Sequence, residues 1–478
     1  MRNTKYIASL LAAVLMLTLV LPMSTLAAEK KSIQDESIYD LLIDRFNNGN
    51  FGNDIDVDAR DDYAFSGGDF VGIGDKAEYI SEMGFSIASI GSPFISDRYD
   101  GNEVISYKEF EPRFGTEEEF VDMIKRLEKK KVAVIADFPL NGISANHEAI
   151  EGQNLPIVEA SDGSIIWDAN DEKVQAFLKE SLLEFVGKYD LTGIRLTYLG
   201  DFSEAYINEL IDALKAEDEN FYVLAAEETT ANFDLKPNFE KMAAMREAFG
   251  SIDPDSSGLN LFSTEDNDQL LQFDDLIGPR FTQDMVDLRM FPPTRWKVAM
   301  TAFLTLPGVP IMPYESEIAV VGKEAPETHP ITNFKTDEEL YDQIKNINGV
   351  RNQSDTLRNG DFELLHNEDG FIVYMRTSDE EKWVIAINNT SETKSFEVDP
   401  EKVGGDKRLR AILANDSVLK GKDDKYRIVL DREVAEMFYV DENKGFNTPY
   451  LIITILIYTT FAGAVIYLIM KGRKNKQA

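Results

Sequence analysis

The chain has 478 residues, no cysteine and a formal net charge of −36, which comes from 85 acidic and 49 basic residues. A chain of this length can bury enough apolar surface for two or three domains. The absence of cysteine excludes disulfides, thiol chemistry and cysteine-bound metals. The strong negative charge argues against nucleic acid as a partner, because it would repel phosphate groups rather than displace their counterions.

The first residues have the pattern of a secretory signal peptide. Arg2 and Lys5 precede an apolar run, and small residues follow between Thr25 and Ala28. A basic start, an apolar run and a small-residue cleavage region together characterise such a signal. We therefore predict a cleaved signal peptide at residues 1–27, and the alternative is an uncleaved membrane anchor.

Between residues 36 and 330, short apolar runs alternate with charged helical stretches. The runs include SIYDLLI, KVAVIADF, TGIRLT and FYVLAAE. The helical stretch EEEFVDMIKRLEKKK has apolar residues at spacings of three and four. This alternation predicts βαβ units around a parallel sheet. A sixth strand is expected between Glu227 and Leu259, but the sequence there has no obvious strand pattern.

From about residue 340 the pattern changes to alternating strands separated by turns. GDFELLHNEDGFIVYMRT and KWVIAINNTS are two examples. Such a pattern predicts a separate, small antiparallel β-domain, which we place at residues 341–441. A short linker is predicted at residues 442–449.

An uncharged apolar run occupies residues 450–470. It is about as long as the ~20 residues that a bilayer span requires. Lysine and arginine residues follow at 471–478, which the positive-inside rule places in the cytoplasm. We therefore predict a transmembrane helix at 450–470, a basic cytoplasmic tail at 471–478, and a single-pass cell-membrane protein with its body outside. An exported chain without disulfides suits a bacterial surface.

An ordered set of sequence pieces resembles the α-amylase family of glycoside hydrolases. The pieces are IDRFNNGN, SGGDFVGI, EPRFGTEEEF, ADFPLN, GIRL, LAAEE, EDND and LPGVPIMPYESEI. The resemblance implies an α/β fold, a (β/α)8 TIM barrel followed by a C-terminal antiparallel β-sandwich. The barrel would occupy residues 28–340, with a short domain B at 142–165. Active sites of such barrels lie at the carboxyl ends of the strands.

The resemblance also assigns catalytic positions. Retaining cleavage of a glycosidic bond needs a nucleophilic carboxylate and a protonated acid about 5 Å apart. By resemblance the acid is Glu227, with Glu228 as the competing register, and a third carboxylate is Asp268 in EDND. The nucleophile position is Thr197. A threonine hydroxyl is a poor nucleophile without a neighbouring base, and it cannot offset developing positive charge.

Other positions depart from the family pattern in the same region. Gly142 and Asn267 stand where the family has histidine, and Asp100 and Asn102 stand where histidine and tyrosine are typical. A family glycine is replaced by Glu315. The residues that the resemblance still assigns to substrate binding are Arg195, Asp137 and Tyr99.

The sequence also matches a calcium loop found in some family members. Its oxygen-bearing residues are Asn48, Asn50, Asn53, Asp54 and Asp69, with the carbonyl of Gly67. Calcium takes six to eight oxygen ligands, so the resemblance implies a calcium ion here. The alternative is a turn that uses Asn and Gly for backbone reasons alone.

Three functions are consistent with these residues. The first is a membrane-anchored, cell-surface pseudoenzyme that binds carbohydrate, an α-glucan or oligosaccharide, or a membrane-protein partner. The second is an active α-glucan or maltooligosaccharide hydrolase that uses Glu227 and Asp268. The third is a structural surface module. Loss of a catalytic nucleophile costs about four to six orders of magnitude in rate, which favours the first function over the second.

Overall fold

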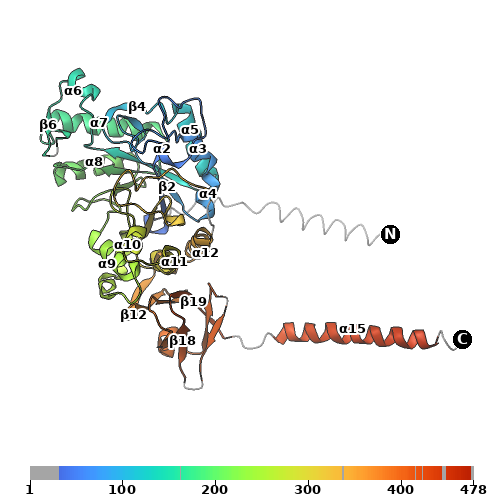
Figure 1. The fold of residues 1–478 in the computed structure, drawn as a ribbon. Coiled ribbons are helices and arrows are strands. Elements are labelled where there is room, and N and C mark those ends of the chain that lie inside the picture. The colour runs from blue at the N-terminus through green and yellow to red at the C-terminus, as the bar shows by residue number, and fades with distance from the viewer. Residues whose placement is uncertain are drawn as a thin grey trace, which may run out of the picture.

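The structure is a computed structural model that describes residues 32–161, 163–335, 339–414, 416–421, 424–443 and 448–474. At residues 268, 448–451 and 467–474 it describes the backbone only. The predicted signal peptide at 1–27 lies outside the described residues. An α/β part is followed by an antiparallel β part that begins at Asp361 (Figure 1).

The α/β part is built on a seven-stranded sheet in the order β10-β11-β1-β2-β5-β8-β9, in which every neighbouring pair is parallel. The strands are β1 Ile38–Asp40, β2 Ile87–Ser89, β5 Ala133–Pro139, β8 Gly193–Thr197, β9 Tyr222–Ala225, β10 Leu270–Leu271 and β11 Val309–Pro313. Nearly all of their residues are buried, as is usual for parallel sheets covered by helices.

Residues 234–236 bridge the two edge strands of this sheet. Leu235 forms a parallel bridge with Leu224 of β9. On the other side, the N–H of Leu270 in β10 donates to the carbonyl of Lys236 at 3.3 Å. This segment therefore takes the place of the sixth strand that the sequence pattern did not reveal. The predicted α/β barrel is confirmed as a barrel-like parallel sheet.

Helices follow most of the strands. They are α2 Ile43–Phe46, α3 Phe70–Asp75, α4 Ala77–Glu82, α5 Glu117–Lys129, α7 Glu172–Lys188, α8 Glu204–Glu217, α9 Phe239–Gly250, α10 Phe281–Asp287, α11 Pro292–Phe303, α12 Glu339–Gln353 and α13 Asp355–Asn359. Helix α5 illustrates the local causes. Thr116 and Glu119 form a capping box at its start, and its buried stripe includes Phe120 and Leu127.

Two short insertions lie at the carboxyl side of the sheet. The first is the antiparallel pair β3 Phe94–Ser96 and β4 Val104–Phe110. The second holds α6 Glu148–Gly152 and the ribbon of β6 Ile157–Glu159 and β7 Ile165–Trp167. It covers the range 142–165 that the sequence analysis predicted as a short domain B, and that domain boundary stays a prediction.

The C-terminal part is a two-layer antiparallel domain, as predicted in outline. A six-stranded sheet has the order β12-β13-β14-β19-β16-β17, and a β15-β18 pair accompanies it. One apolar cluster joins both layers and includes Val373, Val398 and Ile428. The elements are β12 Asp361–Glu368, β13 Phe371–Thr377, β14 Lys382–Asn388, β15 Lys394–Val398, α14 Pro400–Val403, β16 Lys407–Ala411, β17 Ser417–Leu419, β18 Tyr426–Leu430 and β19 Val434–Glu442.

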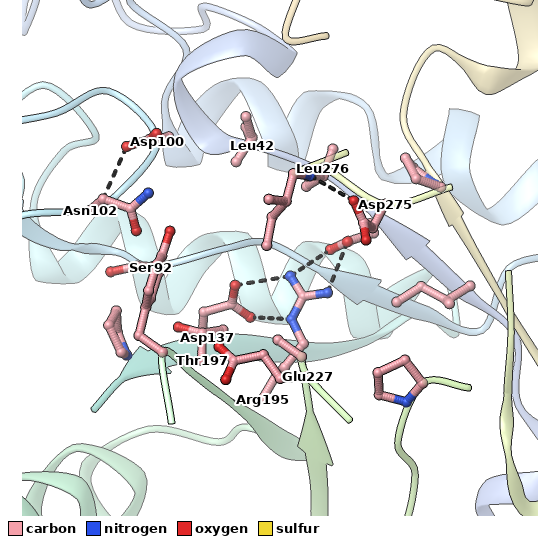
Figure 2. A pocket seen from close by; sticks show the side chains of 18 of the residues that line it. Leu42, Ser92, Asp100, Asn102, Asp137, Arg195, Thr197, Glu227, Asp275 and Leu276 are labelled. Atoms are coloured by element: carbon pink, nitrogen blue, oxygen red, sulfur yellow. Dashed lines mark hydrogen bonds and ion pairs between the residues drawn. The ribbon is translucent and has the colours of Figure 1, made fainter. Parts of the chain in front are cut away.

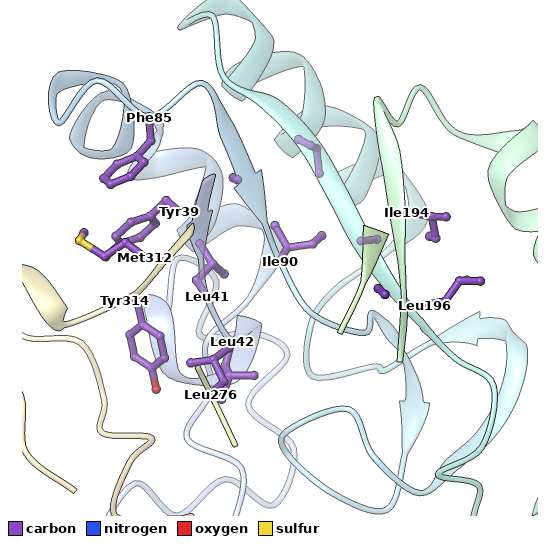
Figure 3. Packing of buried hydrophobic residues seen from close by; sticks show 14 of the residues in the cluster. Tyr39, Leu41, Leu42, Phe85, Ile90, Ile194, Leu196, Leu276, Met312 and Tyr314 are labelled. Carbon is purple, nitrogen blue, oxygen red and sulfur yellow. The ribbon is translucent and has the colours of Figure 1, made fainter. Parts of the chain in front are cut away.

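Strand alternation divides the barrel core into two apolar layers. The larger cluster includes Ile194 and Leu196 of β8 and Tyr39 of β1, and Figure 3 shows part of it. A separate cluster takes one side chain or more from most of the barrel strands, among them Ile38 and Ile135. Side chains two residues apart on a strand share a face. On each strand, the residue two positions after a member of this cluster therefore also faces the barrel axis, and it lies nearer the carboxyl end of the strand.

The predicted transmembrane helix and the predicted cell-membrane localisation are contradicted. In the part of the chain that the structure describes, no helix is both long and apolar enough to cross a membrane. Residues Thr448–Lys474 form helix α15. The predicted membrane-protein partner depended on this helix and has no support.

Candidate active site

A cavity of about 250 Å³ lies where the carboxyl ends of the barrel strands meet. Its walls come from β1, β5, β8, β9, β10 and β11 and from residues that follow these strands (Figure 2). Its polar lining residues are Asp40, Ser92, Arg98, Asp100, Asn102, Asp137, Arg195, Thr197, Tyr198, Glu227, Gln272, Asp274, Asp275 and His329. Because barrels of this type carry their active sites at this end, the cavity is the candidate active site.

Three residues that point into the barrel, Asp40, Asp137 and Arg195, form an ion-pair cluster with the arginine between the two carboxylates. Asp40 lies two residues after Ile38 on β1, and Asp137 lies two residues after Ile135 on β5. Asp137 pairs in register with Arg195 of β8. Residues paired in register in a parallel sheet point to the same face. All three side chains therefore point into the barrel, where they line the cavity.

Arg195 is paired with both carboxylates. Its Nε and Nη2 donate to Asp137 at 2.8 and 2.9 Å, and its Nη1 and Nη2 donate to Asp40 at 2.8 and 2.9 Å. Both pairs are bidentate, the strong geometry for guanidinium and carboxylate. Burial raises the pKa of Asp137 and the Arg195 charge opposes that rise, while the two carboxylates hold the pKa of Arg195 well above its ordinary value despite its burial.

This network uses the two residues that were predicted to bind substrate, Arg195 and Asp137, and adds Asp40. The sequence analysis missed Asp40, although its spacing of two from Ile38 in a short strand could have indicated an inward position. Four of the five N–H groups of Arg195 are engaged by the two carboxylates. The cation therefore has little capacity left for a further carboxylate.

Thr197 is the last residue of β8 and lines the cavity. It is buried, with 8% of its surface exposed. Figure 2 shows it on the same side of the cavity as Asp137 and Glu227. The position that the resemblance assigns to a nucleophilic carboxylate thus carries a neutral hydroxyl inside the site.

The side chains of Glu227 and Glu228 have different surroundings in the structure. Glu227 is half-buried and lines the cavity, where its carboxylate accepts from the N–H of Leu199 at 3.2 Å. Glu228 is exposed and accepts from the N–H of Phe239 at 2.7 Å. Burial raises the pKa of Glu227, partly opposed by the N–H groups of Leu199 and Tyr198. Glu227 is therefore the one of the two that can hold a proton next to a bound ligand.

The EDND segment does not lie where the sequence match implies. Asp268 ends the short 3₁₀ helix Thr264–Asp268, which precedes β10, so its backbone is at the amino end of that strand and not at the carboxyl end. Its side chain is outside what the structure describes. Asn267 is directed toward the C-terminal domain, where its Oδ1 accepts from Arg376 at 2.8 Å.

Residues a few positions further on occupy the expected place. Gln272, Asp274 and Asp275 follow β10 directly and line the cavity. Asp274 is buried and accepts from the N–H of Phe281 at 2.7 Å. Asp275 accepts from the N–H groups of Ile277 and Gly278 at 2.8 and 2.6 Å. The acidic pair directly after the apolar LLQF run was the sequence signal for this position, and the sequence analysis missed it.

Tyr99, predicted to contact substrate, is buried beside the cavity. Its ring lies under the guanidinium of Arg45, 3.8 Å from the Cζ atom, and its hydroxyl hydrogen-bonds to Nδ1 of His329 at 3.0 Å. His329 itself lines the cavity, and burial lowers its pKa. Tyr99 therefore supports the lining residue His329, while its neighbours Arg98, Asp100 and Asn102 line the cavity themselves.

The predicted calcium loop is assembled in space. The Nδ2 of Asn48 donates to both oxygens of Asp54 at 2.9 and 3.1 Å. A Cβ atom at Gly67 would lie 2.8 Å from an oxygen of Asp54. The Oδ1 atoms of Asn48 and Asn53 are buried and have no hydrogen-bond partner. Buried acceptors of this kind require a donor or a cation.

The remaining ligand candidates are partly engaged. The carboxylate of Asp69 accepts from the N–H groups of Gly49, Asn50 and Gly72. Within the described residues, no group of three or more His, Cys, Asp or Glu side chains could hold a metal. This loop has two carboxylates, and its other oxygens come from amides and a carbonyl. All of these candidate ligands are oxygen atoms, and two of them, the buried Oδ1 atoms of Asn48 and Asn53, have no hydrogen-bond partner. Calcium prefers oxygen ligands, so the residues fit a calcium ion.

Comparison with known proteins agrees with the barrel, the cavity at its carboxyl end and the appended β-domain. The model for the alpha amylase catalytic domain matches residues 40–173, and that for the alpha-amylase C-terminal domain matches residues 360–438. Together, the fold and the carboxylate-lined cavity define the chain as a protein of the glycoside hydrolase barrel type.

Individual relatives make the assignment more specific. The crystal structure of an Anoxybacillus α-amylase superposes with a TM-score of 0.82 and 31% identity, over 87% of this chain and all of that one. The α-amylase of Geobacillus thermoleovorans, solved with acarbose, gives 0.80 and 29% over the same shares. The beta/alpha-amylase of Paenibacillus polymyxa is 24% identical, and the match covers 80% of this chain but only 36% of that protein. The chain belongs to the α-amylase family.

Proposed function

We propose that the cavity binds an α-glucan oligosaccharide and that the chain is impaired in cleaving it. The observation that carries this proposal is the pairing of Arg195 with Asp40 and Asp137 beside the neutral Thr197. A retaining mechanism needs a carboxylate about 5 Å from the acid, on the opposite side of the reacting carbon. The carboxylates of Asp40 and Asp137, which line the same cavity, are engaged by Arg195 instead.

The ligand class follows from the family and from the cavity lining. The relatives are amylases, and their substrates are α-glucans. Carboxylate, amide and hydroxyl groups line this cavity, with apolar walls from Leu42, Leu276 and Ile277. A few placed polar groups among apolar walls are typical of small-molecule sites, and sugar hydroxyls can donate to the carboxylates.

Hydrolysis is the second candidate, and the amylase relatives favour it. Glu227 and Asp275 line the same cavity, and burial raises the pKa of Glu227 as a general acid requires. Asp275, which takes the place predicted for Asp268, would then activate a water molecule while Glu227 protonates the leaving oxygen. Such a reaction inverts the anomeric configuration, because water attacks directly.

One experiment separates binding from hydrolysis. The purified full-length chain is titrated with maltoheptaose by calorimetry, and reducing-sugar release from the same sugar is followed over hours. The proposal predicts saturable binding and turnover far below the ~10 s⁻¹ that is typical of enzymes. Turnover in that range, lost in Glu227→Gln and Asp275→Asn, would overturn the proposed impairment, and the product anomer would identify the inverting route.

We also propose that Asn48, Asn53, Asp54, Asp69, Asn50 and the Gly67 carbonyl hold a calcium ion. The two unpaired buried amide oxygens support this proposal. When bound, the ion would cross-link the loop after β1 to the start of α3, since Asp69 is the N-cap residue of that helix. This role is structural, and no step of sugar binding passes through it.

A further inference from the structure

Tyr198 follows Thr197 and lines the cavity in a strained backbone conformation. Its φ is +53°, in the left-handed region that a bulky side chain rarely adopts. Such strain persists only where the surrounding structure imposes it, and it concentrates at functional sites. The sequence analysis did not single out this residue.

Backbone contacts hold Tyr198 in this conformation. Its carbonyl accepts from the N–H of Asn141 at 3.0 Å. The N–H groups of Tyr198 and Leu199 both donate to the carboxylate of Glu227. Successive N–H groups around a left-handed residue form a nest for an anion. The strained turn therefore orients Glu227 and also determines where the Tyr198 side chain is directed.

The ring of Tyr198 packs on a glycine. A Cβ atom added to Gly142 would lie 3.2 and 3.3 Å from the Cδ2 and Cγ atoms of this ring. Gly142 is one of the positions at which the chain departs from the family pattern, and the absence of a side chain there leaves room for the ring. Gly142 also has a φ of +78°, which favours glycine.

The hydroxyl of Tyr198 is held at the other end. It forms a hydrogen bond with the side chain of Asn102, another position that departs from the family pattern. Figure 2 shows Asn102 and Asp100 together at one side of the cavity. With its hydroxyl engaged by Asn102 and its ring packed on Gly142, Tyr198 presents an apolar aromatic surface to the cavity.

We propose that Tyr198 is the wall on which this cavity stacks a neutral pyranose ring. The assignment rests on the proposed function, since it presumes that the cavity binds an α-glucan. A fixed aromatic ring offers a large contact area at low entropy cost. The other walls include Asp40, Asp137, Glu227 and Asp275 against Arg195 and Arg98, so acidic groups outnumber basic ones. This charge disfavours phosphorylated or acidic sugars.

Three substitutions test the wall. Tyr198→Gly removes the ring and tolerates the left-handed backbone, Tyr198→Ala removes the ring but keeps the strain, and Tyr198→Phe keeps the ring and loses the bond to Asn102. We expect Gly and Ala to weaken maltotriose binding by about tenfold or more, equivalent to ~1.4 kcal/mol, and Phe by less than about threefold. Thermal unfolding should show Gly at least as stable as Ala.

The calorimetric outcomes are distinguishable. If the wild-type chain binds maltotriose and Tyr198→Gly binds it equally or more tightly, the ring is not a stacking wall and the assignment is overturned. If the wild-type chain binds no maltooligosaccharide, the proposed function fails and this assignment fails with it. Maltose 1-phosphate is the second probe, and binding at least as tight as that of maltose would overturn the preference for a neutral sugar.

Discussion

At the scale of single residues, the distinguishing feature is that the positive charge of Arg195 is already balanced by two carboxylates. Arg195 remains two residues before the nucleophile position, but its partners are Asp40 and Asp137. A lone substitution at Thr197 would therefore not recreate an ionised nucleophile next to a free guanidinium. The loss of catalysis that we propose is a property of the whole cluster.

We expect Thr197→Asp alone to destabilise the fold by about 3–5 kcal/mol and to add no measurable turnover. The new carboxylate would be buried without a free cation. Adding Asp40→Asn releases at least one N–H group of Arg195 for the new carboxylate, so the double variant should recover part of that stability. Urea unfolding and reducing-sugar release measure both effects.

Asp40→Asn alone is the control for this comparison. It shows how much stability Arg195 loses when one of its two bidentate partners becomes neutral. A single Thr197→Asp variant as stable as the wild-type chain would contradict the view that Arg195 is saturated.

A second residue-scale prediction concerns Glu315. This side chain is 3% exposed, its backbone has a φ of +67°, and its carboxylate accepts from the N–H of Asn333 at 2.7 Å. Burial raises the pKa of Glu315 from 4.5 to about 7, although the Asn333 N–H opposes the rise. Between these values the folded state holds a proton that the unfolded chain has released. This contribution to stability is therefore complete below pH 4.5 and is lost as the pH rises through 7.

Glu315→Gln removes this titration while keeping an acceptor for Asn333. We expect its unfolding free energy, relative to the wild-type chain, to increase by roughly 3 kcal/mol between pH 4.5 and pH 8. Denaturant titrations of both chains at several pH values measure the difference. A difference that stays constant with pH would show that folding does not raise the pKa of Glu315.

At the scale of elements, the sequence pattern found most of the barrel strands and missed those that are very short. Strand β10 has two residues, and the bridge at 234–236 makes only isolated bonds. A periodic pattern cannot be recognised in so few residues. The same brevity explains why EDND was assigned to the wrong end of β10, since nothing in the local pattern marks where that strand begins.

The calcium loop gives an element-scale prediction. We expect chelation with EDTA to lower the melting temperature of the wild-type chain by a few degrees, because a ligand that binds only the folded state stabilises it. Asp54→Ala and Asn48→Ala should abolish this calcium-dependent difference. Differential scanning calorimetry with and without calcium makes the measurement.

Asp58→Ala is the matched control for the calcium loop. Asp58 belongs to the same acidic segment but forms an exposed ion pair with Arg60, so its loss should leave the calcium effect intact. Equal melting temperatures of the wild-type chain in calcium and in EDTA would indicate the alternative interpretation, a turn that binds no metal.

At the scale of the whole molecule, buried arginines join the barrel to the β-domain. Arg376 of β13 donates to the carbonyl of Thr305 at 3.3 Å and to Asn267 at 2.8 Å, both in the barrel part. Arg295 of α11 reaches Asn389 and Glu433 of the β-domain. These bonds satisfy polar groups that would otherwise be buried without partners.

We expect Arg376→Ala to destabilise the chain by about 2–4 kcal/mol, because it leaves the Asn267 and Thr305 acceptors unpaired at the junction. Arg376→Lys keeps a charge but not the planar fork, so its effect should be intermediate. Urea unfolding followed by tryptophan fluorescence gives both values. An alanine variant within 0.5 kcal/mol of the wild-type chain, the range typical of surface sites, would contradict this role.

The sequence by itself determined the α-amylase family and the barrel followed by a β-domain, and it placed Thr197 at the position that the family resemblance assigns to the nucleophile. Each of these depends on residue types at motif spacing. Only the tertiary structure decided that Asp40 and Asp137 share Arg195, that Asp275 rather than Asp268 follows β10 into the cavity, and that Tyr198 fills the space over Gly142. Those contacts join strands and loops distant in the chain, so local patterns do not contain them.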